Sequence, residues 1–182
     1  MPVLSSTSKE GLIRIAREAL EHFVKTGEVS CLRPEDPVLW EHWPCFVTLR
    51  KRGQLRGCVG TLRTEKPLHE ELVKMTAAAA SEDFRFKPLT PEELKDITIE
   101  ISVVSPLERI HSPSEIEVGR HGVYIKWRDQ SGAFLPEVGQ EMGWTAEELV
   151  RSCFQEKAQL PLEAWTEAEL YRFTTEKIKE NA

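Results

Sequence analysis

The residues best suited to chemistry lie in the run Leu55–Leu62, a strand-like stretch with an arginine, a cysteine and two glycines. Because side chains alternate along a strand, Arg56 and Cys58 are expected on one face, roughly 6.5–7 Å apart along it. A guanidinium beside a thiol increases the thiolate fraction, and the thiolate is the nucleophilic form of cysteine. Gly57 and Gly60 weaken a strand, and their usual purpose there is to let a ligand or another backbone come close. The run therefore predicts a chemical or binding site.

The arginine and the cysteine each have an alternative role. Cys58 would act as a small hydrophobic residue if it were buried, as free cysteines commonly are. Arg56 can hold a carboxylate or phosphate through two parallel hydrogen bonds instead of acting on the thiol. The sequence leaves nucleophilic chemistry, anion binding and packing open.

Three further residues are candidates for the same site. His121 lies in the glycine-flanked turn Gly119–Gly122, where we expect an exposed ring able to serve as a general base for Cys58. The alternative is a histidine that bonds to its own backbone. Glu100 would orient His121 or act as an acid, or else be a surface carboxylate. Arg85 stands between two phenylalanines and is either a stacked structural cation or a clamp for a ligand.

The composition is typical of a globular protein. The 182 residues are 40% hydrophobic and 30% charged, which is enough for one domain with a substantial core. The formal net charge of -6 argues against a protein that binds nucleic acid mainly through electrostatics. One compact group of basic residues, Arg50–Arg52, either meets an anionic ligand or flanks a solvated turn.

The four cysteines, at positions 31, 45, 58 and 153, include no CxxC pair. We expect free thiols in a reducing cytosol, because Met1–Leu4 has no secretory signal and no apolar run is long enough for a membrane span. His42 and Cys45 hint at a zinc site, but two residues fall short of the usual four ligands. We therefore expect a cytoplasmic protein without a metal or another cofactor.

Hydrophobic periodicity and capping signals predict the elements that position these residues. The predicted helices run from the Thr7–Glu10 capping box to about Gly27, from Pro67 through the closely packing alanine run 77–80, briefly from Thr90, and from Thr145. The predicted strands are the hairpins 45–50 with 55–62 and 123–127 with 133–135, the alternating strand 97–104, and a C-terminal segment at 165–173. This order predicts an α+β fold with a mostly antiparallel sheet flanked by helices.

Several short segments, in order along the chain, match the pattern of one known family. The first is Leu55–Gly60, which reads Leu-Arg-Gly-Cys-Val-Gly. The others are Glu82–Pro88, Ile99–Val104, Val118–Val123, Leu135–Val138, Gly143–Trp144 and Glu156–Ala158. The chain therefore resembles the AMMECR-one family, whose hallmark is Leu-Arg-Gly-Cys-Ile-Gly. It departs from the family's pattern at Phe84, Glu137 and Gln159, where proline, glutamine and glycine are usual.

The resemblance implies an α+β fold in which residues 1–182 form a single domain, with a larger part and a small subdomain inserted within it. Similar prokaryotic proteins are commonly encoded beside a Memo-like protein and a radical-SAM protein, in the AmmeMemoRadiSam system. The resemblance implies these two as partners. It attaches no reaction to the chain.

Three hypotheses follow. The first is a cytosolic accessory or binding protein whose cleft holds a small anionic molecule or a segment of a partner protein. Its ligand-binding residues would be Arg56, Gly57, Gly60, Arg85 and Glu100. The second is a thiol-dependent enzyme in which Cys58 is the nucleophile, His121 the base and Arg56 the anion stabiliser. The third is a structural strand whose glycines serve only close packing.

Overall fold

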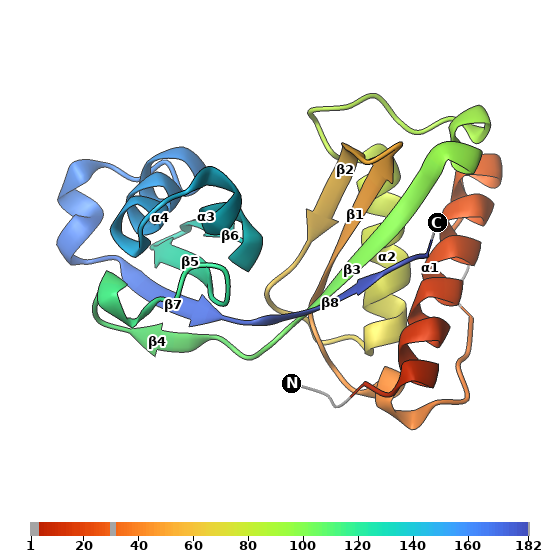
Figure 1. Ribbon diagram of the computed structural model, residues 1–182, viewed down its shortest axis with the longest axis horizontal. Coiled ribbons are helices and arrows are strands. Elements are labelled where there is room, and N and C mark those ends of the chain that lie inside the picture. The colour runs from red at the N-terminus through yellow and green to blue at the C-terminus, as the bar shows by residue number, and fades with distance from the viewer. Residues whose placement is uncertain (1–3, 30–31, 182) are drawn as a thin grey trace. The chain divides into compact units, whose positions relative to one another are not determined.

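The computed structural model describes residues 4–29 and 32–181, which form two compact units. Unit 1 comprises the described residues of 1–104 and 176–182, and unit 2 comprises residues 105–175. Unit 2 is thus inserted, along the chain, ahead of the last strand of unit 1 (Figure 1). Each unit has its own sheet and its own hydrophobic core.

The sheet of unit 1 has four strands in the order β2-β1-β3-β8, so β2 lies at an edge. The strands are β1 (Cys45–Lys51), β2 (Gln54–Gly60), β3 (Ile97–Val104) and β8 (Thr175–Lys179). β1 pairs antiparallel with β2 and with β3, which confirms the predicted hairpin. Arg52 and Gly53, between β1 and β2, have φ angles of 50° and 83°, the left-handed conformation of a two-residue hairpin turn.

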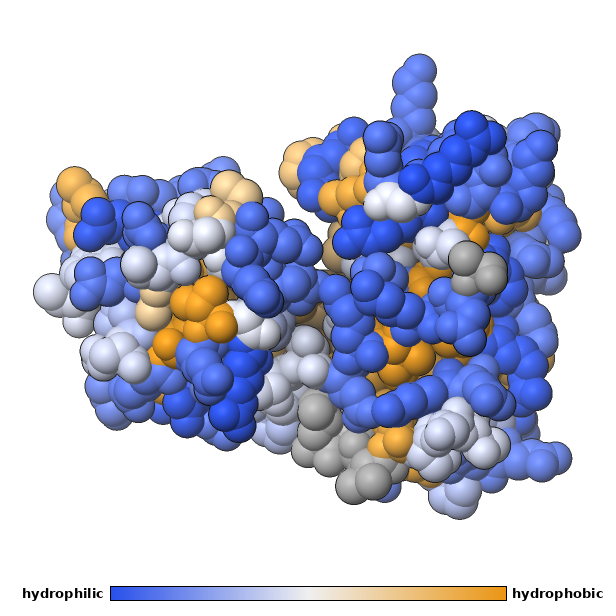
Figure 2. All heavy atoms as spheres, in the orientation of Figure 1, coloured by the Kyte–Doolittle hydropathy of each residue, from blue (hydrophilic) through white to orange (hydrophobic). Residues whose placement is uncertain are grey.

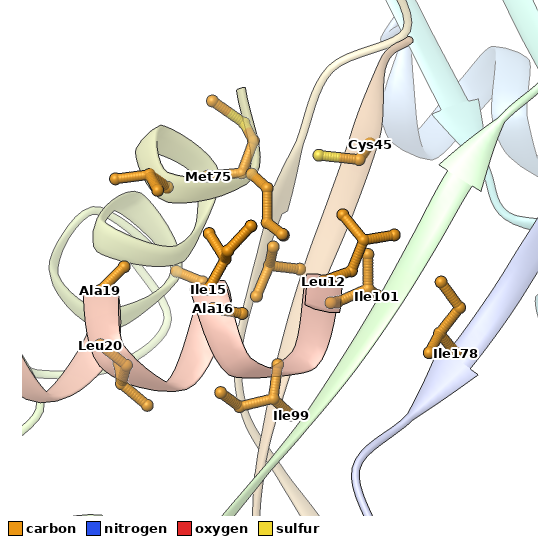
Figure 3. Close-up of a cluster of buried hydrophobic side chains, with 14 of the residues drawn as sticks. Leu12, Ile15, Ala16, Ala19, Leu20, Cys45, Met75, Ile99, Ile101 and Ile178 are labelled. Carbon is orange, nitrogen blue, oxygen red and sulfur yellow. The ribbon is translucent and has the colours of Figure 1, made fainter. Parts of the chain in front are cut away.

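Two helices cover one face of this sheet, α1 (Ser6–Thr26) and α2 (Leu68–Ser81) (Figure 1). Aliphatic side chains at helical spacing on α1 meet Ile99 and Ile101 of β3 in the core of unit 1 (Figure 3). Both predicted helices are confirmed. They cover the inner face of the sheet, and β1, β2 and β3 pack against them.

The two ends of α1 differ in how well they follow the prediction. The predicted capping box begins at Thr7, but Ser5 is the capping residue, and its hydroxyl accepts the backbone N–H of Ser8 at 3.0 Å. The helix ends as predicted at Gly27, whose φ of 76° is a left-handed conformation that glycine adopts at low cost.

Short 3-10 helices at Pro37–Trp40 and Pro91–Asp96 connect the elements of unit 1. The second is the predicted short helix after Thr90, whose backbone N–H donates to the Glu93 carboxylate at 3.1 Å. This helix leads directly into β3, so Glu93 is held near the sheet.

Unit 2 has a second four-stranded antiparallel sheet, in the order β4-β7-β5-β6. Its strands are β4 (Glu108–Ile110), β5 (Gly122–Trp127), β6 (Gln130–Phe134) and β7 (Glu169–Phe173). Its helical segments are Pro113–Glu115, α3 (Pro136–Met142), α4 (Ala146–Ser152), the π-helical turn Cys153–Lys157 and Leu162–Thr166. The predicted hairpin and the predicted helix after Thr145 are both present.

The predicted α+β class with mostly antiparallel strands is confirmed. In unit 2, the sequence did not predict β4, α3 or the short helices Pro113–Glu115 and Leu162–Thr166, and the last of these includes residues 165 and 166, which were expected in the C-terminal strand. Pro136, taken from the sequence as the end of a strand, is the first residue of α3, a position that suits proline because its missing N–H would be unpaired there. β4 has three residues, too few for a recognisable alternation. Across the described residues, no helix is both long enough and apolar enough to cross a membrane.

Candidate functional site

Cys58 lies on the edge strand β2, where two residues of unit 1 contact it. It pairs with Thr48 of β1, whose hydroxyl donates to the Cys58 sulfur at 3.2 Å. Its own backbone N–H donates to the Asp83 carboxylate at 2.9 Å rather than to β1. The thiol is half-buried. Asp83 thus holds the loop after α2 against the sheet edge at the cysteine.

A β-bulge separates Arg56 from the regular part of the strand. Leu49 of β1 pairs with Gly57, whereas the next residue, Arg50, pairs with Leu55, so Arg56 is the extra residue. The regular alternation expected between Arg56 and Cys58 is therefore interrupted. Bulges re-aim side chains, and here the Arg56 side chain reaches groups beyond the sheet edge.

Those groups are a carboxylate and an aromatic ring. Nε and Nη2 of Arg56 each donate to one Glu93 carboxylate oxygen at 3.0 Å, an ion pair with two parallel hydrogen bonds. The Arg56 guanidinium carbon lies 5.8 Å from the centre of the Phe86 ring. The hydrogen bond from Arg56, ahead of that from Lys51, lowers the pKa of Glu93 to about 2.

Arg85 forms a second such ion pair on the same phenylalanine. Its Nε and Nη2 donate to the two Asp83 oxygens at 2.9 and 2.7 Å, and its guanidinium carbon lies 5.5 Å from the Phe86 ring centre. The hydrogen bond from the Arg85 side chain is the largest cause that lowers the pKa of Asp83 to about 2. Phe84, the other neighbour of Arg85, is 96% exposed. Arg85 is therefore a stacked, paired cation.

The basic group Arg50–Arg52 is paired in the same way. Arg50 contacts Glu100, Lys51 contacts Glu93, and Arg52 contacts Asp96, at 2.9 to 3.1 Å between the charged atoms. These carboxylates neutralise the cations that the sequence offers for an anionic ligand. An anion would have to displace a carboxylate to bind here.

The two glycines of the hallmark run are explained by packing inside unit 1. A Cβ on Gly57 would lie 2.2 Å from the backbone oxygen of Ala79 in α2. A Cβ on Gly60 would lie 2.2 Å from the ring of Phe46 in β1. Of the two purposes expected from the sequence, the close approach of another backbone is the one found at Gly57. The alanine run of α2 provides that approach, as predicted.

Glu100 is a buried carboxylate, not a surface one. Glu100 of β3 pairs with Thr48 of β1, which pairs on its other side with Cys58 of β2. The Glu100 side chain is 9% exposed. Arg50 donates to its Oε1 at 3.0 Å, and the ammonium groups of Lys177 and Lys179 lie 3.6 and 3.5 Å from its oxygens. Burial alone would raise the pKa of Glu100, but these three cations outweigh it and the pKa is lowered. Glu100 is thus held as an anion by its own unit.

His121 belongs to unit 2 and does not have the exposed ring expected from the sequence. The residue is 9% exposed, and its Nδ1 accepts the backbone N–H of Glu117 at 3.0 Å. Gly119 has a φ of 87° and turns the chain back, so that this bond can form between residues that are four positions apart. Burial, ahead of the charges of Arg172 and Arg120, lowers the pKa of His121. The alternative role, a histidine bonded to its own backbone, is the one observed.

The three cysteines among the described residues are all free. Cys45 and Cys153 are buried, and burial raises the pKa of both thiols, that of Cys153 to about 12. Cys58 is the half-exposed one, and Cys31 lies outside the described residues. No group of three or more histidine, cysteine, aspartate or glutamate side chains suited to a metal occurs in the part of the chain that the structure describes.

Three residues of the site were not singled out from the sequence. Asp83 and Glu93 pair with the two arginines, and Thr48 contacts the thiol. Asp83 lies two residues from Arg85, a spacing that could have suggested the pair. Glu93 was recognised only as a helix cap, because nothing local connects it to an arginine 37 residues earlier.

Comparisons with known proteins agree with this fold. A family model described as AMMECR1 matches residues 13–178. A protein of Thermococcus gammatolerans is 42% identical over 186 residues, covering 94% of this chain and 89% of its own. Protein TK0174 of Thermococcus kodakarensis is 40% identical over 185 residues, with the same two shares covered. The crystal structure of the uncharacterised protein PH0010 from Pyrococcus horikoshii matches with a TM-score of 0.90 and 34% identity, covering 98% of this chain and 94% of that chain.

Proposed function

Since this chain belongs to the AMMECR1 family, we propose that it is a binding protein that docks a partner protein on the edge of β2. The docking site consists of Leu55, Cys58, Phe84 and Arg85, called the β2 edge surface below. The observation that carries the proposal is the 96% exposure of Phe84 beside the hallmark strand. A large aromatic side chain so exposed has much apolar area to bury against a partner.

The turn that carries Phe84 is held in place before any partner arrives. The backbone N–H of Phe86 donates to the carbonyl of Asp83 at 3.0 Å, which closes the turn around Phe84. The Asp83 carboxylate fixes this turn to Cys58 of β2 at 2.9 Å. A preorganised turn loses little conformational entropy on binding, so more of the contact energy of Phe84 contributes to affinity.

A protein segment fits this surface better than a small anion does. Arg56 and Arg85, the cations expected to bind an anion, are already paired with Glu93 and Asp83. Leu55 is 38% exposed and adds apolar area on β2 itself. Because the backbone N–H of Cys58 is taken by Asp83, we expect the partner to pack on side chains rather than to extend the sheet.

The partners implied by the family resemblance are a Memo-like protein and a radical-SAM protein. Each would present an apolar recess for Phe84, with polar groups at its rim facing the Asp83–Arg85 ion pair.

The test is a calorimetric titration of the full chain with the purified Memo-like protein and, separately, the radical-SAM protein of the same source organism. Phe84→Ser removes the anchor and, at an exposed position, leaves stability within about 0.5 kcal/mol of the original. We expect it to weaken binding about 30-fold, which is about 2 kcal/mol for a hot-spot aromatic. The matched control is Leu162→Ser, a 79% exposed apolar residue of unit 2.

Each outcome decides a part of the proposal. Loss with Phe84→Ser alone supports the β2 edge surface. Equal binding of Phe84→Ser and the original chain excludes that surface as the docking site. If neither protein binds, the implied partners are wrong.

A second function, thiol chemistry at Cys58, is favoured by the contact that the Thr48 hydroxyl makes with the sulfur. In that function the half-exposed thiol would lose its proton to solvent, and the thiolate, stabilised by the hydrogen bond from Thr48, would form a C–S bond at an electrophilic carbon whose leaving group departs with its electron pair. Cys58→Ser separates the two functions, because serine keeps the shape of the surface but removes the nucleophile. Partner binding that survives Cys58→Ser supports docking, whereas an activity that this variant abolishes supports the enzyme.

A further inference from the structure

We propose that unit 1 carries a second binding site, a pocket beside the first turns of α2 that takes a planar aromatic anion with a hydroxyl group. The pocket has a volume of about 640 Å³, within the size range of small-molecule sites. It is called the α2 pocket below and lies along Trp40, Lys66, His69, Glu70, Val73 and Lys74, all of unit 1. Its described lining shares no residue with the β2 edge surface, so the site does not depend on the docking proposal.

His69 of α2 carries a hydrogen-bond acceptor that has no partner. The residue is 1% exposed, and its Nδ1 lies 2.9 Å from the carbonyl oxygen of Leu39. A carbonyl oxygen only accepts, so Nδ1 carries the proton and Nε2 of the neutral ring is an acceptor. Nε2 has no hydrogen-bond partner among the residues that the structure describes.

This unpartnered nitrogen opens into the α2 pocket. In the described part of the chain, one side-chain atom is both fully buried and without a hydrogen-bond partner, and it is Oε2 of Glu100. Nε2 of His69 is therefore not fully buried, and it reaches solvent at the pocket that the residue lines. A ligand O–H can donate to Nε2 there, whereas a carboxylate, which only accepts, cannot. The ligand must therefore present a donor as well as a charge.

Trp40 and Val73 form the apolar part of the α2 pocket. The Trp40 ring lies 4.4 Å from the His69 ring between ring centres, and its indole N–H donates to the carbonyl of Pro34 at 3.0 Å. These two contacts hold the indole in place, yet Trp40 is 43% exposed. Val73 is 2% exposed and belongs to the core of unit 1, so the pocket reaches that core. A flat ring that stacks on the indole buries its exposed area, which favours a planar aromatic ligand.

Charged residues run along the rim of this apolar part. Glu70 and Lys74, four positions apart on α2, lie on one helix face beside the buried pair His69 and Val73. The pocket is lined by both pairs, so it follows the boundary between them, within reach of the long Lys74 side chain. Figure 2 shows that such boundaries are common on the visible face of unit 1, where hydrophobic patches are bordered by hydrophilic residues.

The charges at the rim favour an anion. Three cations, Arg33, Lys66 and Lys74, line the pocket, and Glu70 is the one carboxylate in its described lining. The side chains of these cations form no ion pair with any residue that the structure describes. At 1.5 Å per residue, Lys74 lies about 7.5 Å along α2 from His69. Two fused rings with a hydroxyl at one end and a carboxylate at the other span this distance.

The experiment titrates 6-hydroxy-2-naphthoate into the full ¹⁵N-labelled chain and follows amide and indole chemical shifts. We expect saturable shifts at the Trp40 indole and at the amides of α2 between His69 and Lys74. The hydroxyl is tested on the ligand, because substitution of the buried His69 would also change the packing of unit 1. The compound 2-naphthoate, which lacks the donor, should bind about tenfold more weakly.

The charge is tested on the protein. The double variant Lys66→Gln with Lys74→Gln should weaken 6-hydroxy-2-naphthoate about tenfold. The matched control, Lys87→Gln with Lys95→Gln, makes the same charge change at two exposed lysines of unit 1 outside the pocket lining. It should leave the affinity unchanged.

The results separate the proposal from its failure. No saturable shift at about 5 mM 6-hydroxy-2-naphthoate, equal affinity for the two probes, or equal loss in the two double variants would each overturn it. Shifts that saturate away from Trp40 and α2 would overturn it as well. The spectra themselves report whether each variant remains folded. Phe84→Ser should leave this titration unchanged, so the result does not depend on the docking site.

Discussion

The substitution Gly57→Ala tests whether the hallmark glycine serves packing. The added Cβ would lie 2.2 Å from the backbone oxygen of Ala79, whereas ordinary contact begins at 3.4 Å. Strand β2 and helix α2 would therefore have to separate by about 1.2 Å at this point, the difference between those two distances. A backbone atom in a helix cannot rotate away as a side-chain tip can. We expect the free energy of unfolding to fall by about 2–3 kcal/mol.

Urea unfolding followed by circular dichroism measures this loss as a lower midpoint at an unchanged slope. The matched control is Gly11→Ala in α1, where the added Cβ would have its nearest neighbour, in Leu39, at an ordinary 3.7 Å. Alanine is the better helix former, so this control should raise the free energy of unfolding by about 0.5–1 kcal/mol. A loss below about 0.5 kcal/mol for Gly57→Ala would refute the packing role. The glycine would then be explained by a ligand instead.

Three further outcomes are expected. The pKa of Glu93 is lowered from 4.5 to about 2, so its ion pairs stabilise the fold fully above pH 4.5 and less as the pH falls towards 2. Glu93→Gln should therefore lower the free energy of unfolding by about 2 kcal/mol at pH 7 and should flatten the decline in stability seen in acid unfolding curves. An unaltered decline would contradict the assignment. Iodoacetamide should alkylate Cys58 about 100-fold faster than Cys45 or Cys153, read by peptide mass mapping of the folded chain, and comparable rates would show that burial does not protect these two. His121→Gln should leave the pH profile of Cys58 alkylation unchanged, and a shifted profile would restore His121 as its base.

Elements with a strong hydrophobic period were predictable from the sequence. The apolar face of α1 and the alternation of β3 each repeat over several turns or residues, so the pattern is unambiguous. β8 was not predicted, because Ile178 is its single buried residue and an edge-like polar strand has no alternation to recognise. Helix α3 was missed because Pro136 suits the first turn of a helix as well as the end of a strand.

The candidate site was predictable in its residues and not in its pairing. Arg56, Cys58 and Arg85 were recognised from type and spacing. The ion pair of Arg56 with Glu93 joins residues 37 positions apart, and the β-bulge that directs Arg56 towards it was not predicted, although a glycine inside a strand, here Gly57, can mark a bulge. The hydrogen bond between His121 and Glu117 is local. The glycine-flanked turn favours this bond and an exposed His121 ring equally, so the sequence alone did not decide between the two.

The most direct test of the docking proposal is the alkylation rate of Cys58 with and without a saturating amount of the partner that binds in the titration. Cys58 lies within the β2 edge surface and is half-exposed, so a docked partner should cover it. At a partner concentration about ten times the dissociation constant of the original chain, we expect the rate to fall about tenfold, whereas Phe84→Ser, which binds about 30-fold more weakly, should keep about three quarters of its rate. An unchanged rate while the partner is bound would contradict the proposal that it docks on this surface.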